Sequence, residues 1–163
     1  MSALNRPAVL LLATLAPMAA AVGANPDGFT NQFPIAACEF KTHGGNDFLI
    51  LQVNRQLYLS NQRCDECIEE EGLEELWITV LPETRVVKFF HGGKLRAVRT
   101  RVLEEFETVD GELEEVSKNF VADCNPMNDV YYFGEDVFDG DGNPLPDAWL
   151  AGRDGAKPGI LMP

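Results

Sequence analysis

The sequence predicts a mainly β protein: an antiparallel meander forming a curved sheet or a partly open barrel, with a C-terminal loop covering one end. Short runs rich in β-branched and aromatic residues recur along the chain, and Gly- or Pro-containing turn signals separate them. No segment keeps a helical period for more than about three turns. Successive hairpins therefore account for the pattern best.

The N-terminal segment 1–24 has the pattern of an export signal. A short basic start precedes an uncharged apolar run, and small residues stand at 21–24, so the mature chain is expected to begin at Asn25. The apolar run is short, contains Pro17 and has no charged stop, which favours a signal over a transmembrane anchor. We expect a secreted or periplasmic protein with no membrane attachment after cleavage and a single β domain over 25–163.

The first elements of that domain are expected to be short. After a loose lead-in, 35–41 is expected to be a strand, and 42–47, with its Gly pair, a turn. The apolar segment 48–59 predicts one long strand or two short ones. The acidic segment 60–72 predicts either a helical turn or an extended loop.

The rest of the chain has the rhythm of strands and turns. Strands are expected over 76–81, 85–90, 95–108, 112–122 and 130–137. Pro82 is expected to interrupt the first two of these. The tail 148–162 contains Gly and Pro at short intervals, so we expect it to wrap over the open end of the sheet with Trp149 as its plug.

The hairpin around Asp110-Gly111 can be tested against its side chains. A two-residue loop with an unshifted register places glutamates opposite each other and Phe106 opposite a glutamate, which is unfavourable. A slip of one residue places Phe106 opposite Val116, with other apolar and charged pairs matched as well. We therefore predict this shifted register with a three-residue loop, because side-chain pattern sets register more strongly than the turn dipeptide.

Charge is abundant and uneven. The chain has 26 acidic and 13 basic residues, for a net charge of −13. Such a surface repels phosphate backbones and anionic lipid, so nucleic acid and membranes are not expected partners. A small ligand of unknown class, a cation or a basic protein surface suits it better. Six of the bases lie within 85–101, where they either pair with neighbouring acidic strands or form an anion site.

Four cysteines in an exported chain predict two disulfides. Three connectivities are possible; we favour the local pair Cys64–Cys67, which leaves Cys38–Cys124. The Cys-x-x-Cys spacing also suits a redox dithiol or half a zinc site. The surrounding acids disfavour the thiolate, however, and zinc would need further ligands. Haem attachment is excluded because Ile68 follows the second cysteine of this motif.

One polar turn spaces oxygen ligands at alternate positions, as a calcium loop does; these residues are Asp139, Asp141 and Asn143. The EF-hand pattern fails because Pro144 and Leu150 occupy its glycine and glutamate places. No cofactor is therefore expected. A different calcium site that draws on Glu135, Asp136 or Asp147 stays an open alternative, and a plain turn is the simpler interpretation.

No nucleophile motif and no phosphate-binding glycine loop is present, so we expect a binding or structural module rather than an enzyme. The alternative is a small hydrolase or metal-dependent enzyme with its site near 135–157. In either case the hypothesis is a ligand beneath the tail, flanked by Glu135, Asp136, Trp149, Arg153, Asp154 and Lys157.

Two motifs carry a family resemblance: NDVYYFGEDV over 128–137 and AWLAGRDGAKPGILMP over 148–163. With shorter runs between them, they make the part 84–163 resemble a family of uncharacterised exported bacterial and archaeal proteins. The resemblance implies an exported antiparallel β domain and brings no known activity. Similar members continue past the Met-Pro, so the end at Pro163 is expected to be a truncation, an unpaired sheet edge or a gene fragment. The segment 38–67 departs from the family's opening and is expected to be a local elaboration.

Overall fold

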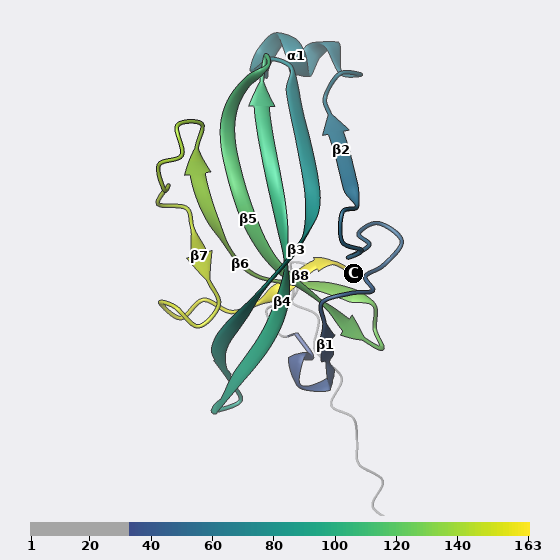
Figure 1. Cartoon of the computed structure of the whole chain (residues 1–163), viewed down its shortest axis with the longest axis vertical. Coiled ribbons are helices and arrows are strands. Elements are labelled where there is room, and N and C mark those ends of the chain that lie inside the picture. Colours follow the sequence, from purple (N-terminus) through teal and green to yellow (C-terminus); the bar gives the residue numbers. More distant parts are fainter. Residues whose placement is uncertain (1–32) are drawn as a thin grey trace, which may run out of the picture. The chain divides into compact units, whose positions relative to one another are not determined.

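The computed structural model describes residues 33–163, and the expected signal segment 1–24 lies outside the described residues. The elements along the chain are shown in Figure 1. In order, they are η1 (Ile35–Ala37), β1 (Glu39–Lys41), β2 (Gln56–Ser60), α1 (Asp65–Glu71), β3 (Glu74–His91), β4 (Lys94–Val109), β5 (Glu112–Asn125), β6 (Asp129–Asp139), β7 (Trp149–Leu150) and β8 (Gly159–Met162).

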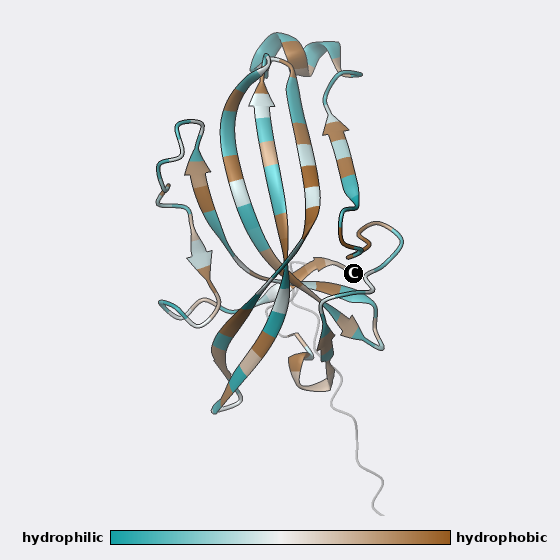
Figure 2. Ribbon diagram, viewed as in Figure 1, coloured by the Kyte–Doolittle hydropathy of each residue, from teal (hydrophilic) through white to brown (hydrophobic). Residues whose placement is uncertain are grey.

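Within the described part of the chain, the strands form one antiparallel sheet, which confirms the predicted fold class. The hydrogen-bonded order is β2-β3-β4-β5-β6-β7, with β1 added to β5 and β8 added to β6, and the sheet does not close into a barrel. Hydrophobic and hydrophilic residues alternate along the strands (Figure 2), as expected when the two faces of a sheet have different surroundings. Residues 33–163 form one compact unit.

β3 continues through Pro82, so the expectation of two strands interrupted there is wrong. The pairing shifts between Val80 and Thr84, and this irregularity bends the strand without ending it. Proline lacks only the N–H, and a bulge needs no ladder hydrogen bond at that position. The buried Arg101 instead binds the bulge carbonyls. Its Nη1 donates to the oxygens of Leu81, Pro82 and Glu83, and its Nε donates to the oxygen of Thr42.

The β4–β5 hairpin has the predicted register, with Phe106 opposite Val116. The expected three-residue loop is wrong. Asp110 and Gly111 form a two-residue turn, both with positive φ (51° and 83°), and a bulge after Glu107 shifts the register. The hairpin thus has both the turn that the dipeptide favours and the register that the side chains favour, because the bulge accommodates the extra residue within a strand.

Two hydrophobic clusters lie on opposite faces of the sheet. The larger lies where the lower parts of β3 and β4 pack with η1 and β6, and it includes Tyr131, Phe133 and Phe89. The smaller places Leu49 and Leu51 against β4 and β5. These two leucines belong to the segment 48–59, for which one long strand or two short ones were predicted. Only its end lies in a strand of the sheet, β2. The preceding residues form a hydrogen-bonded loop that fills the core.

Both predicted disulfides, Cys38–Cys124 and Cys64–Cys67, are present. The first joins β1 to β5 beside the larger cluster. The second lies at the start of α1, the helical alternative predicted for the acidic segment. Disulfides persist in oxidising compartments, so this pair of bonds indicates a location outside the cytosol. None of the helices within 33–163 is long and apolar enough to span a bilayer.

Two short segments differ from the expected elements. Residues 35–37 form η1 rather than strand, and the tail expected to be a loop contributes β7 and β8 to the sheet. The tail also packs against β3: a Cβ at Gly152 would lie 2.3 Å from the Lys88 carbonyl oxygen. The tail therefore requires glycine at this contact.

Candidate functional site

The upper half of the sheet, from β2 to β6, has side chains accessible on both faces. Directly opposed residues of antiparallel strands share a face, so the register assigns each side chain to one face. We call one the carboxylate face; its residues are Leu57, Leu59, Leu76, Ile78, Glu105, Glu107, Glu115, Asn119, Glu135 and Trp149. We call the other the aromatic face; its residues are Tyr58, Trp77, Phe106, Val116 and Phe138.

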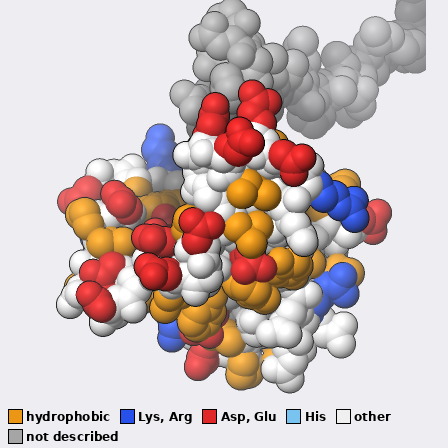
Figure 3. Space-filling model, turned by 90° about the horizontal axis from the view of Figure 1, so that it is seen from above, with side chains coloured by type: hydrophobic (Ala, Val, Ile, Leu, Met, Phe, Trp, Pro, Cys, Tyr) orange, Lys and Arg blue, Asp and Glu red, His pale blue; other side chains and the backbone are white. Residues whose placement is uncertain are grey.

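The carboxylate face is divided into two strips. An apolar strip over β2 and β3 consists of four residues: Leu57, Leu59, Leu76 and Ile78. An acidic strip over β4 to β6 lies directly beside it, since Ile78 pairs with Glu105 and Leu76 pairs with Glu107. Seen from above, acidic and hydrophobic side chains are interspersed at this end of the molecule (Figure 3). The surface is therefore amphipathic across its width.

A groove lies where the two strips meet. Its volume is about 370 Å³, and it is lined by Leu59, Ser60, Asn61, Glu74, Glu75, Leu76 and Glu107. Leu59 is 52% exposed at its rim. The groove thus presents aliphatic carbon and carboxylate oxygen to the same occupant.

The acidic strip is crowded enough to shift its own titration. Burial raises the pKa of Glu105, the charge of Glu135 adds to this, and a hydrogen bond from Asn119 opposes it. Burial likewise raises the pKa of Glu115, with the charges of Glu107 and Glu135 adding. Positive charge at this strip would relieve the repulsion.

A polar cluster around Tyr132 lies at the β6 end of the acidic strip. The hydroxyl lies 2.7 Å from the Glu135 carboxylate and also contacts the Asn119 side-chain oxygen. The Tyr132 and Trp149 rings meet edge to face with centroids 5.1 Å apart. Burial and then the hydrogen bond to Glu135 raise the pKa of Tyr132. The hydroxyl has one proton, so it can donate fully to only one of these two oxygens at a time.

The aromatic face carries a row of rings. Tyr58 pairs with Trp77, and Trp77 pairs with Phe106 across three adjacent strands. Their exposures are 51%, 36% and 39%. The Tyr58 hydroxyl donates to Glu75 at 2.6 Å. The register also places four charged residues on this face, so its rings lie among charges of both signs: Glu75, Glu104, Lys118 and Asp136.

Of the predicted ligand-flanking residues, Glu135 and Trp149 are brought together, since they pair directly between β6 and β7. Asp136, next along β6, forms an ion pair with Arg85 at 2.6 Å. Neighbouring strand residues point to opposite faces, so Asp136 lies away from Glu135.

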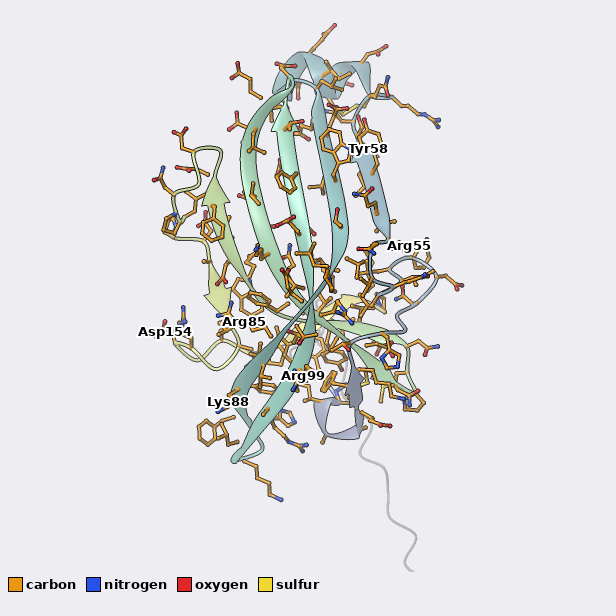
Figure 4. The ribbon with its side chains drawn as sticks, in the orientation of Figure 1. Arg55, Tyr58, Arg85, Lys88, Arg99 and Asp154 are labelled. Atoms are coloured by element: carbon orange, nitrogen blue, oxygen red, sulfur yellow. A yellow bond between two sulfur atoms is a disulfide. The ribbon has the colours of Figure 1, made fainter. Side chains whose placement is uncertain are left out.

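The remaining three predicted residues, Arg153, Asp154 and Lys157, are exposed in the turn between β7 and β8. Figure 4 shows Asp154 at the left side of the molecule, away from Tyr58. Among residues 33–163, no hydrogen bond or ion pair links these three side chains to Glu135. The structure therefore does not bring the predicted site together as a whole.

The proposed calcium turn is held by its own hydrogen bonds. The Asp139 carboxylate accepts from the backbone of Asp141 and from the backbone and side chain of Asn143. The hydrogen bonds from Asn143 lower the pKa of Asp139. In the described range, no group of three or more acidic, His or Cys side chains has a metal-binding arrangement. The hydrogen bonds to Asp139 fix the conformation of this turn.

Sequence reasoning missed Glu105, Asn119 and Tyr132 as members of one cluster. They come from three different strands, and only the β5–β6 register brings Asn119 opposite Glu135. The available signal was Tyr132, a tyrosine whose neighbours Tyr131 and Phe133 are both expected in the core. Alternation therefore points Tyr132 to the other face.

Comparison with known proteins gives no relatives: no family model, no curated protein and no solved structure matches this chain.

Proposed function

We propose that this chain is an exported binding module whose carboxylate face takes a basic, partly apolar polypeptide segment. The observation that carries the proposal is the direct contact between the apolar strip and the acidic strip, with a groove where they meet. An amphipathic basic segment would place apolar side chains over β2 and β3 and cations over Glu105 and Glu107. Complementary charge of this kind sets specificity and association rate.

Charge supports a basic partner over other classes. The net charge of −13 repels polyanions. Burial is the main cause of the raised pKa of Glu105, and the negative charge of Glu135 adds to it. The disulfides agree with export into an oxidising compartment.

The test is fluorescence anisotropy with a labelled peptide of alternating Leu and Lys, compared with one of alternating Leu and Glu. We expect only the Lys peptide to bind, more weakly as salt is raised from about 50 to about 300 mM. Binding of both peptides alike would refute the proposal.

Two carboxylates on β4 provide a matched pair of variants. Glu107 lines the groove, whereas Glu104 lies on the opposite face, 3.9 Å from Lys118. We expect Glu107→Gln to weaken Lys-peptide binding about two- to fivefold and Glu104→Gln to have a smaller effect. Equal effects would mean that net charge, rather than this face, attracts the peptide.

The alternative, a small hydrolase, has one observation in its favour. Glu105 has a raised pKa and lies diagonally across Asn119 from Glu135, so a carboxyl able to hold a proton stands near a second carboxylate. Hydrolysis of aryl glycoside or ester substrates that is abolished by Glu105→Gln would favour the enzyme. Activity unchanged by that substitution would assign it to a contaminant.

A further inference from the structure

The lower β3–β4 hairpin is basic in an otherwise acidic protein. Two of its arginines are engaged: Arg85 with Asp136, and Arg101 with backbone carbonyls. Lys88 and Arg99 lie on this hairpin (Figure 4). The ion pairs within residues 33–163 use neither of these side chains nor Arg96. These side chains could therefore still bind an anion, the second interpretation that the sequence analysis gave for the bases in 85–101.

A cavity of about 210 Å³ lies beside this hairpin, between the lower part of β4 and the segment η1–β1. It is lined by Ile35, Cys38, Phe40, Phe89, Arg96, Ala97, Val98 and Arg99. Arg96 pairs with Phe89 and so shares its face, toward the larger hydrophobic cluster. Six of the eight lining residues are apolar, but the surface exposed to the cavity is mainly polar, and two arginines line it.

The Nε atom of Arg96 is buried and has no hydrogen-bond partner among the described residues. A buried donor without a partner is destabilising, and a charged one more so. A guanidinium binds a carboxylate side-on, through Nε–H and one terminal N–H, in two parallel hydrogen bonds. A carboxylate would therefore satisfy this donor and match the geometry of the guanidinium.

We propose that this cavity binds a small monocarboxylate whose carboxylate pairs with Arg96. The size agrees, because an apolar cavity of about 150 Å³ is enough for a benzene ring. The site is separate from the carboxylate face, so it stands or falls independently of the proposed function.

The test is an NMR titration of the chain beginning at Asn25 with benzoate and with benzyl alcohol, its neutral analogue. We expect benzoate to shift the amide signals of Ala97 and Val98 and to bind about tenfold or more tightly than benzyl alcohol. Equal affinities, or benzoate shifts that map elsewhere, would overturn the proposal.

Variants distinguish a direct contact between Arg96 and the carboxylate from the general positive potential of the hairpin. Arg96→Gln should abolish the preference for benzoate, whereas Lys94→Gln removes one exposed charge from the same hairpin and should leave the preference in place. Arg96→Lys keeps the charge but loses the side-on geometry, and should reduce the preference. A preference that survives Arg96→Gln would contradict the assignment. If that variant does not fold, the Arg96→Lys result and the comparison of the two ligands decide.

Discussion

Arg101 holds the central bend of the sheet, and its replacement should be among the most destabilising single changes in this chain. The side chain is 9% exposed and joins the β3 bulge to the loop at Thr42. Its two short hydrogen bonds, 2.9 Å to the Thr42 oxygen and 2.8 Å to the Pro82 oxygen, count most. The contacts at 3.2 and 3.4 Å add little.

The magnitude follows from these contacts. A hydrogen bond to a charged donor contributes about 1.5–3 kcal/mol, so the two short bonds contribute about 3 kcal/mol or more. Arg101→Met also leaves carbonyls without a donor, and we expect a loss of about 3–5 kcal/mol in the free energy of unfolding. A domain of this size has about 5–15 kcal/mol in total, so the variant should be marginal.

Urea unfolding followed by circular dichroism measures this directly, with the slope used to check that the transition stays two-state. Arg99→Met is the matched control, because Arg99 is an exposed arginine on the same strand with one contact of 3.4 Å to Thr84; it should change stability by about 0.5 kcal/mol. A loss below about 1 kcal/mol for Arg101→Met would refute the idea that this side chain holds the bulge.

Three further predictions concern stability. Removing the Cys38–Cys124 disulfide, whose sequence separation is 86, should cost about 4–5 kcal/mol by loop entropy, whereas the second disulfide, with a separation of 3, contributes about 1–2 kcal/mol; similar losses in urea unfolding would contradict this. Gly152→Ala should lower thermal stability by about 2 kcal/mol or more, because φ is +89° and the new Cβ meets the Lys88 carbonyl oxygen; an unchanged melting temperature would count against the tail contact. The raised pKa of Glu105 means that the folded state holds this proton more tightly than the unfolded state. Its contribution to stability is therefore lost as pH rises from about 4.5 through the raised pKa. Glu105→Gln should flatten that part of the pH profile, and a profile identical to that of the parent chain would refute the shift.

The strand pattern could be predicted from sequence because local alternation and turn chemistry agree with the fold. Phe106 opposite Val116 follows from side chains alone, and the two disulfides follow from the cysteine spacing and the expected export. Pro82 misled because proline ends a regular strand but not a bulged one, and the bulge depends on Arg101, a residue distant in sequence.

The candidate site was less accessible to sequence reasoning. Glu135 and Trp149 could be nominated from motifs, whereas Asn119 and Glu105 join them only through pairing of β5 with its two neighbours. Register between strands joined by an irregular turn depends on bulges, such as the one between Asn119 and Val121, that no local pattern specifies. Long-range pairing, rather than residue chemistry, limited the prediction.

The most direct test of the binding account is to map the Leu-Lys peptide onto the sheet by NMR. If the carboxylate face is the docking surface, the methyl signals of Leu76 and Ile78 shift and broaden on titration, while the ring signals of Trp77 and Phe106 stay in place. Shifts confined to Trp77 and Phe106 would place the ligand on the aromatic face and contradict the account.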